Sequence, residues 1–125
     1  MRELVIKKCK KCGAMVKVIE DCNCPSCGIM CCEEVMKPVA ANGTDGAVEK
    51  HLPTYEINKD EIVVIVNHVM EEDHYIEWIS AVTEDEEYTK YLKPGMEAKA
   101  IFKYSKGMTL YSYCNKHSLW KVEVK

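Results

Sequence analysis

The sequence predicts a mostly β protein in which a small cysteine-bound metal module is followed by an antiparallel β-sandwich. Seven of the eight cysteines lie within the first 32 of the 125 residues, which marks a boundary in composition. Beyond that boundary, short β-branched and aromatic runs alternate with turn-forming residues, a spacing typical of an antiparallel sandwich. We therefore divide the chain into a metal module, residues 1–37, and a sandwich, residues 38–125.

The metal module begins with a Cys-x-x-Cys-Gly motif that provides Cys9 and Cys12 as one half of a four-sulfur site. The two thiolates lie within reach of one ion, and Gly13 lets the chain turn so that backbone N–H groups face the sulfurs. A segment this short cannot fold on hydrophobic burial alone, so we expect a bound metal to hold it together.

The other half of this site has two possible origins. One is the pair Cys24 and Cys27, whose spacing repeats that of the first motif, and the other is the adjacent pair Cys31 and Cys32. Spacing alone favours Cys24 and Cys27. Four thiolates around a tetrahedral ion suit structural zinc and rubredoxin-type iron equally well, so the ligand type leaves both metals open.

Small and turn-forming residues over 39–46 predict a linker between the two parts. The run 61–66 after it is continuous and β-branched and lacks the 3.6-residue spacing of an amphipathic helix, which predicts a buried strand. The acidic run 84–87 is expected to be a solvated turn. The expected strands cover residues 61–66, 75–82, 87–92, 98–104, 109–114 and 119–124.

All four histidines of the chain lie beside a strand end or a turn, where a rigid sandwich presents side chains to a shared site. His68 and His74 bracket one loop, and His51 precedes the first strands. His117 follows Cys114 by three residues, so a tight turn can direct both side chains at one ion. Taken singly, each histidine is explained as a surface or hydrogen-bonded residue, and Cys114 as an inert buried thiol.

If these five residues converge, the ligand set is four imidazoles and one thiolate. That set exceeds an ordinary structural zinc site and leaves an octahedral ion one position short. Imidazole suits iron, and a thiolate opposite the vacant position donates electron density toward a small molecule bound there. The pattern therefore predicts a redox-active iron with one open position.

Charge and targeting signals exclude several classes of partner. The net charge is -3, lysines and acids are interspersed, and no long basic run is present to neutralise a phosphate backbone, so nucleic acid is not expected. The N-terminus has only three consecutive apolar residues before two lysines, which fits neither a signal peptide nor a membrane anchor. We expect a cytoplasmic protein with no membrane partner, in which clustered cysteines bind metal rather than form disulfides.

Four segments together resemble the desulfoferrodoxin family, in that family's order and over nearly the whole chain. They are Glu-Lys-His at 49–51, His68 with Met-Glu-Glu-Asp-His-Tyr-Ile-Glu-Trp at 70–78, Leu-Lys-Pro-Gly at 92–95 and Cys-Asn-Lys-His at 114–117. The resemblance implies an immunoglobulin-like sandwich with a ferrous site that reduces superoxide to hydrogen peroxide. The implied ligands of this site are four equatorial histidines and one axial cysteine: His51, His68, His74, His117 and Cys114.

The resemblance also implies roles for Glu49 and Lys50. Glu49 occupies the sixth position of the oxidised iron, and Lys50 attracts the superoxide anion and supports protonation. Without the resemblance, both are explained as an exposed ion-pair neighbourhood of little energetic consequence. One departure from the family is that Asn67 and Val69 flank His68, where proline is usual, which changes the stiffness of the loop more than the identity of the ligand.

In the family, the N-terminal part is a desulforedoxin-like iron site whose last two ligands are adjacent cysteines. The resemblance therefore favours Cys31 and Cys32 over the pair that spacing favours. The predicted ligands are the four cysteines that match the family: Cys9, Cys12, Cys31 and Cys32. We expect iron there, with zinc as the alternative. The inserted cysteines depart from the family and receive no role: Cys22, Cys24 and Cys27.

The resemblance further implies a rubredoxin-like electron donor that reduces the iron again after each turnover, and a homodimer. Two other functions stay open from the residues alone. One is a non-catalytic iron protein of electron transfer, which would not form hydrogen peroxide from superoxide. The other is a zinc-ribbon interaction module, which would contain zinc and no iron.

Overall fold

The computed structural model describes residues 2–43 and 48–125, apart from the side chain of Glu49. The chain forms two compact units, which we call the cysteine unit, Glu3–Ala40, and the sandwich, Ala41–Lys125 together with Arg2. The described residues are almost entirely β, with one helix of four residues, and the predicted fold class is confirmed. Among these residues, no helix is long and apolar enough to cross a membrane.

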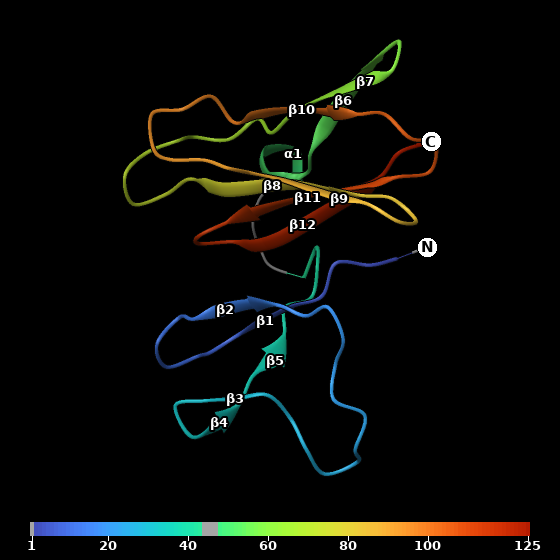
Figure 1. Ribbon diagram of the computed structural model, residues 1–125. Coiled ribbons are helices and arrows are strands. Elements are labelled where there is room, and N and C mark those ends of the chain that lie inside the picture. The colour runs from blue at the N-terminus through green and yellow to red at the C-terminus, as the bar shows by residue number, and fades with distance from the viewer. Residues whose placement is uncertain (1, 44–47) are drawn as a thin grey trace. The chain divides into compact units, whose positions relative to one another are not determined.

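The cysteine unit is built from very short strands (Figure 1). One sheet has the order β2-β1-β5, and a separate hairpin pairs β3 with β4; every pairing is antiparallel. The five strands are β1 (Ile6–Lys8), β2 (Met15–Lys17), β3 (Met30–Cys31), β4 (Glu34–Val35) and β5 (Lys37–Pro38). The buried hydrophobic residues described in this unit are few: Leu4, Ile6, Cys9 and Met36. Strands and core this small give little stability without a cross-link.

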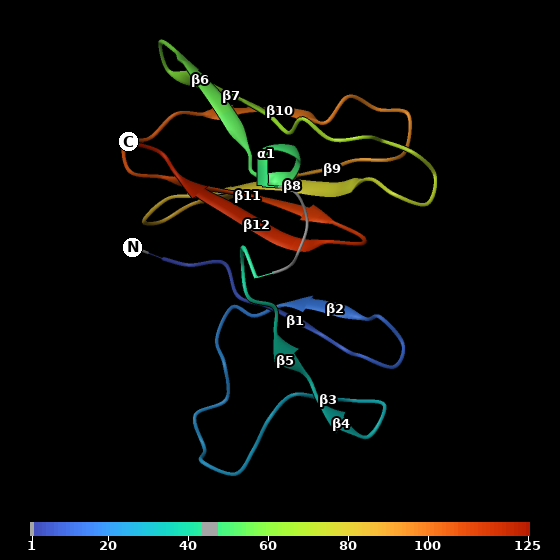
Figure 2. The same ribbon diagram turned by 180° about the vertical axis from the view of Figure 1, so that it is seen from behind.

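The sandwich consists of two antiparallel sheets (Figures 1 and 2). One sheet has the order β10-β7-β6 and the other the order β12-β11-β8-β9. The helix α1 (Val48–His51) precedes the strands, which are β6 (Thr54–Asn58), β7 (Glu61–Ile65), β8 (Ile76–Val82), β9 (Glu87–Tyr91), β10 (Lys99–Lys103), β11 (Thr109–Cys114) and β12 (Ser118–Glu123). Seven strands in two packed sheets are the architecture of an immunoglobulin-like domain.

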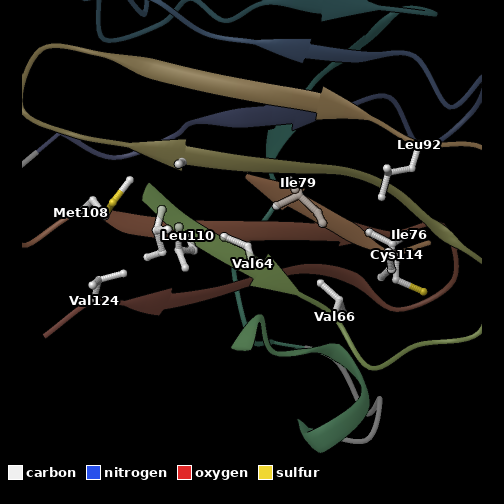
Figure 3. Packing of buried hydrophobic residues seen from close by; sticks show 13 residues of the cluster. Val64, Val66, Ile76, Ile79, Leu92, Met108, Leu110, Cys114 and Val124 are labelled. Carbon is white, nitrogen blue, oxygen red and sulfur yellow. The ribbon is translucent and has the colours of Figure 1, made fainter. Parts of the chain in front are cut away.

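The core of the sandwich lies between its sheets because side chains alternate along each strand. In β7, Val64 is fully buried, whereas the next residue, Ile65, is 42% exposed. Figure 3 shows Val64 in one cluster with Ile79 of β8 and Leu110 of β11. The strand β11 buries all of its residues, since it lies between β8 and β12. This central strand is therefore a rigid support for the residue at its end, Cys114.

The predicted strands of the sandwich are all present, with each end within one residue of its expected position. The strand β6, Thr54–Asn58, was missed. It lies at the edge of its sheet, four of its five side chains are exposed, and only two of its residues, Tyr55 and Ile57, are apolar. Edge strands of this kind leave the weakest pattern in a sequence.

The predicted linker, residues 39–46, lies partly outside the described residues, which omit 44–47. On one side, the N–H of Val39 donates to the carbonyl of Ile6 at 2.8 Å, within the cysteine unit. On the other side, the N–H of Asn42 donates to the carbonyl of Leu119 at 2.8 Å, within the sandwich. The described ends of the linker are thus each fixed to their own unit.

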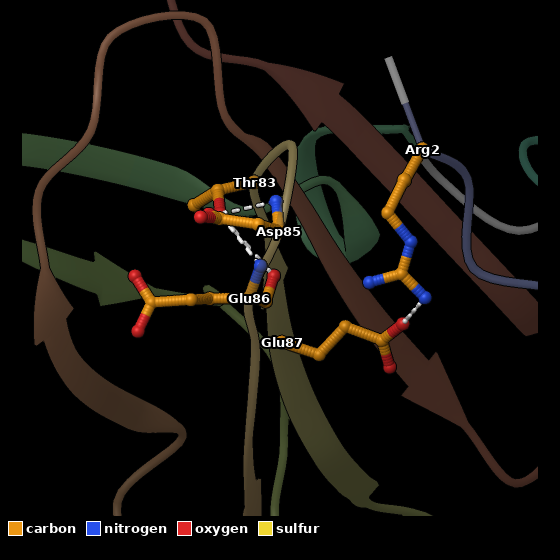
Figure 4. A network of polar contacts seen from close by, with 5 residues as sticks. All are labelled: Arg2, Thr83, Asp85, Glu86 and Glu87. Atoms are coloured by element: carbon orange, nitrogen blue, oxygen red, sulfur yellow. Dashed lines mark hydrogen bonds and ion pairs between the residues drawn. The ribbon is translucent and has the colours of Figure 1, made fainter.

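The acidic run 84–87 forms the turn between β8 and β9 (Figure 4). The hydroxyl oxygen of Thr83 accepts the N–H of Asp85 at 3.4 Å and that of Glu86 at 3.0 Å, which closes the turn. Glu87 pairs with Arg2 at 2.9 Å, and its side chain is only 18% exposed. The expectation of a solvated turn is correct for the tip and fails at Glu87, where the pairing with Arg2 covers the carboxylate.

Candidate metal centres

The four histidines and Cys114 come together in the sandwich, although they are spread over 67 residues of sequence, from 51 to 117. Each residue offers one ligand atom, and these atoms all lie within 4.8 Å of one another. His51 ends α1, His74 precedes β8, and Cys114 ends β11. His68 follows β7, and His117 lies in the turn between β11 and β12.

The distances between donor atoms show that the rings face a common point. His51 Nε2 lies 3.0 Å from His117 Nδ1. Cys114 Sγ lies 3.4 Å from His68 Nε2 and 3.8 Å from His117 Nδ1. Metal–nitrogen and metal–sulfur bonds are roughly 2.0–2.3 Å, so donors around one ion are separated by up to twice that length. The spread of these donor atoms therefore fits a single ion.

Hydrogen bonding sets the tautomer of His68. Its Nδ1 faces the carbonyl oxygen of Val69, which can only accept, so Nδ1 carries the proton. The lone pair is then on Nε2, the atom that faces Cys114. Burial is the main cause that lowers the pKa of His68, and the positive charges of His74, His117 and Lys50 lower it further. A neutral ring with its lone pair directed into the cluster is the form that binds a metal.

His74 has a buried ring nitrogen, Nε2, that lacks a hydrogen-bond partner among the described residues. Burial is also the main cause that lowers its pKa, followed by the nearby charge of His117. A buried polar atom without a partner loses its hydration without compensation, which is rare in folded proteins. A metal bond to Nε2 would satisfy this atom.

Cys114 is fully buried. Its sulfur accepts the backbone N–H of His117 at 3.4 Å, a contact that stabilises negative charge on sulfur. A buried thiolate still needs a cation close to it. Taken together, the four imidazoles, the buried sulfur and the partnerless nitrogen of His74 fit a redox-capable ion such as iron better than structural zinc, because five donors exceed a tetrahedral set.

Several residues that the sequence did not single out hold the ligands in place. The indole of Trp120 stacks on His51, with ring centroids 5.0 Å apart, and its Nε1–H donates to the carbonyl of His117 at 2.9 Å. The hydroxyl of Ser112 donates to the carbonyl of His51 at 2.8 Å. The nearness of Trp120 and Ser112 to Cys114 in sequence was the available signal. Such supporting contacts fix the orientation of metal ligands.

Asn115 ties the loop that carries His74 to the turn after β11. Its side-chain amide donates to the carbonyl of Asp73 at 2.9 Å, and its side-chain oxygen accepts the N–H of Tyr75 at 3.0 Å. Both contacts bracket His74 in sequence. The asparagine between Cys114 and Lys116 therefore aligns two segments that approach from different strands.

The two residues proposed to act on substrate lie on α1. Lys50 is exposed and directly precedes His51, and its charge contributes to lowering the pKa of His68. The side chain of Glu49 lies outside the described residues, so the structure does not place the carboxylate predicted for the sixth position. The backbone of Glu49 is within α1.

The cysteine unit brings together a second group, whose sulfurs also lie within 4.8 Å of one another: Cys9, Cys12, Cys31 and Cys32. Cys12 Sγ lies 3.6 Å from Cys31 Sγ. The backbone N–H of Cys12 donates to Cys9 Sγ at 3.5 Å, and Gly13 has the positive φ of 80° that the turn requires. The structure therefore places the adjacent pair, rather than the pair favoured by spacing, beside Cys9.

A tight hairpin explains how two adjacent cysteines reach one point. Cys31 pairs with Glu34 across the β3–β4 hairpin, and the two residues of its loop, Cys32 and Glu33, have φ values of 50° and 67°. Positive φ at both central positions is the signature of a type I′ turn. This turn reverses the chain directly after Cys31, so Cys32 lies beside it.

The sulfurs of Cys9 and Cys31 differ strongly in acidity. The N–H groups of Cys12 and Lys11 stabilise the thiolate of Cys9, and its pKa is lowered to about 6. The neighbouring sulfurs of Cys12 and Cys9 raise the pKa of Cys31 to about 12. Like charges this close cannot all form without a cation between them, so a fully ionised set requires a metal.

Cys24 and Cys27 do not belong to either group, because they are joined in a disulfide. Cys22 is a free, exposed thiol. The expectation that clustered cysteines bind metal rather than form disulfides is therefore wrong for Cys24 and Cys27. Their sulfurs are bonded to each other and leave the adjacent pair to complete the four-sulfur group.

Comparisons with known proteins agree with one another. A family model described as Desulfoferrodoxin matches residues 43–123. A desulfoferrodoxin homolog of Archaeoglobus fulgidus is 38% identical over 120 residues, which cover 93% of this chain and 94% of the relative. The desulfoferrodoxin of Nitratidesulfovibrio vulgaris is 40% identical over 123 residues, 94% of either chain. The crystal structure of the superoxide reductase from Treponema pallidum has a TM-score of 0.72 and 26% identity, covering 97% of this chain and 99% of that one.

Proposed function

This chain belongs to the desulfoferrodoxin family, and we propose on that basis that it is a superoxide reductase that forms hydrogen peroxide at a mononuclear non-haem iron. The family match confirms the resemblance seen in the sequence. The single observation that carries the proposal is the convergence of four imidazoles and one thiolate on one point of the sandwich. A solved superoxide reductase with the same overall fold supports an oxidoreductase role.

The proposed ligands are the five residues of this cluster: His51, His68, His74, His117 and Cys114. When bound, ferrous iron supplies the single electron that superoxide takes up. Burial favours the neutral form of His68 and His74, and Trp120, Ser112 and Asn115 hold the ligands in place. Because His51 and Cys114 are buried, bulk water has little access to these two side chains.

Lys50 and Glu49 are the proposed residues that act on substrate. Lys50 places a positive charge on the exposed side of α1, next to the ligand His51, where it attracts the superoxide anion. Its ammonium also holds a proton that can be donated as peroxide forms. Glu49 is proposed to close the vacant position after oxidation, which would protect the site between turnovers.

Rapid mixing of the reduced protein with superoxide tests this function. We expect one hydrogen peroxide for each superoxide consumed, with no oxygen released. Oxygen release with half as much peroxide would identify a dismutase instead. Oxidation of the protein without any peroxide would identify an electron-transfer protein. Either result would overturn the proposal.

For the cysteine unit we propose iron, held by Cys9, Cys12, Cys31 and Cys32, as a second redox site. Four sulfurs of this kind also suit zinc, so metal content decides. We expect about two irons per chain, one for each group of donors. Zinc and no iron in the whole chain would instead support an interaction module.

We also propose that a rubredoxin-like protein returns electrons to this chain. A hollow beside Cys9 is lined by Lys8, Lys10 and Lys37, and these positive side chains suit an acidic redox partner. The homodimer and the cytoplasmic location that the family implies belong to the same proposal. Light scattering of the iron-loaded protein checks whether it is a homodimer, because a single chain has a mass of 14.3 kDa.

A further inference from the structure

Three cysteines of the cysteine unit take no part in either group of metal donors: Cys22, Cys24 and Cys27. All three are exposed, and they fall within six residues of sequence. Cys24 and Cys27 form a disulfide across a turn, with their Cα atoms 5.6 Å apart, which lies within the usual range for this bond. The segment 22–27 therefore presents an S–S bond to solvent.

The segment is fixed at both ends to the unit that holds the four-sulfur group. Before it, Asp21 pairs with Lys7 of β1 at 2.9 Å, and the Lys7 side chain is only 9% exposed. After it, Gly28 lies so close to Val35 of β4 that a Cβ on this glycine would be 2.7 Å from the Val35 side chain. The backbone at both ends is thus anchored while the sulfurs project outward.

Neither a structural cross-link nor a metal site explains this pair. A disulfide between residues three apart closes a very small loop, and small loops gain least from cross-linking. Among the described residues, the inserted cysteines do not join any group of three or more metal donors. Exposed disulfides are the ones that thiolates can attack, and they are typically labile or catalytic.

We propose that Cys24 and Cys27 form a redox-active disulfide that accepts two electrons from an external dithiol by thiol–disulfide exchange. A thiolate of the donor can attack either exposed sulfur of the pair. Attack at Cys24 Sγ breaks the S–S bond, and Cys27 leaves as a thiolate that takes up a proton. The second thiol of the donor then attacks the mixed disulfide and releases Cys24 as a thiol. The donor ends as a disulfide, and the chain gains two electrons and two protons.

The reduced form of the pair has a hydrogen-bond acceptor close to Cys27. Cys27 Sγ lies 3.2 Å from the carbonyl oxygen of Cys24. Once Cys27 is released and protonated, its S–H can donate to this oxygen without a change of position. This hydrogen bond stabilises the reduced, protonated pair after the S–S bond has broken.

The surroundings of the pair point to a protein as the donor. Ile19 is 86% exposed, Met30 58% and Val35 51%, and these residues flank the segment in sequence or contact its anchor. Exposed apolar side chains near a reactive bond suit the apolar core of a protein–protein interface more than a small charged thiol. We therefore assign the donor to small proteins that carry a Cys-x-x-Cys dithiol.

Alkylation of the native, iron-loaded protein followed by peptide mass spectrometry tests the proposal without any superoxide assay. In air, we expect Cys22 to be labelled and Cys24 and Cys27 to be protected. After treatment with a Cys-x-x-Cys dithiol protein, both should be labelled, with iron absorption unchanged. Labelling before reduction, protection after it, or loss of iron on labelling would each overturn the proposal.

Variants give a second readout from the donor. The wild-type chain should oxidise two donor thiols per chain, and Cys22→Ser, the matched control on the same segment, should do the same. The double variant Cys24→Ser with Cys27→Ser should oxidise none while retaining its iron. Continued oxidation by the double variant would contradict the assignment. Faster reduction by dithiothreitol than by the dithiol protein at equal concentration would contradict the choice of a protein donor.

Discussion

The sandwich has a cluster of thirteen buried hydrophobic residues from both sheets, whereas the described part of the cysteine unit buries only four hydrophobic residues; each set includes one candidate ligand, Cys114 and Cys9 respectively. We expect the strands of the sandwich to bring the histidines together without help from a metal. In the cysteine unit, the metal takes the place of the missing core. The difference teaches that, within one chain, one metal site can be formed by a unit that is already folded while another unit folds only when its metal binds.

Removal of both metals should therefore give the largest difference in stability between the two units. We expect the cysteine unit to unfold, because structural metals contribute roughly 10–16 kcal/mol in small cysteine modules. The sandwich should stay folded. Amide hydrogen exchange of the chelated protein measures both at once, since protection should be lost over residues 3–40 and kept over the strands of the sandwich. Equal protection of both units would contradict the claim that only the cysteine unit needs its metal to stay folded.

Truncation of a core residue should destabilise the sandwich and not the cysteine unit. Ile79 is fully buried in the sandwich, and Ile79→Ala should lower the free energy of unfolding of that unit by about 2–5 kcal/mol. Both tryptophans, Trp78 and Trp120, belong to the sandwich, so fluorescence during denaturant unfolding follows this unit alone.

Ile101 provides the matched control for this measurement. It is 52% exposed in β10, so Ile101→Ala should change the free energy of unfolding by less than about 0.5 kcal/mol. Equal losses for the two variants would mean that the cluster between the sheets does not stabilise the sandwich.

The sequence predicted the sandwich better than the cysteine unit for a physical reason. The strand β7 carries a continuous run of β-branched apolar residues over 62–65, whereas the exposed edge strand β6 has only two apolar residues among five. The strands of the cysteine unit have two or three residues, too few for any period to show.

The sites follow the same division. The histidine cluster was predicted from residue type and family resemblance, and the structure brings its members together. The choice between two cysteine pairs depended on a turn with positive φ at Cys32 and Glu33, and neither residue type signals such a turn. The disulfide of Cys24 and Cys27 was not foreseen either, because spacing is the same for a metal knuckle and for a disulfide.

Substitution of Lys50 tests whether the sandwich attracts superoxide by a charge beside its metal site. Lys50→Ala should slow the reaction with superoxide by roughly tenfold and flatten its dependence on ionic strength, because a positive charge beside the site steers the anion. Metal content should not change. Lys103→Ala, a lysine on β10, is the control and should leave the rate unaltered. An unchanged rate and salt slope for Lys50→Ala would remove this residue from the mechanism.

Protonation of the histidines should give the smallest effect, and only in the metal-free sandwich. Burial lowers the pKa of His68 and His74 below the usual 6.5, so the unfolded chain binds protons more readily than the folded one. The free energy of unfolding should be largest above pH 6.5 and fall as the pH decreases through that value.

The variant His68→Gln should reduce this pH dependence, since it removes one of the two groups. Tryptophan fluorescence during denaturant unfolding at several pH values provides the measurement. A stability that rises as the pH falls from 7 to 5 would contradict the burial of neutral rings.

The most direct test of the histidine–cysteine site is the visible absorption of the oxidised, iron-loaded protein. We expect a sulfur-to-iron charge-transfer band that disappears in Cys114→Ser, while the bands of the four-cysteine site remain and Cys22→Ser leaves every band unchanged. If the band persists in Cys114→Ser, the sulfur of Cys114 is not bound to iron, and the proposed ligand set is wrong.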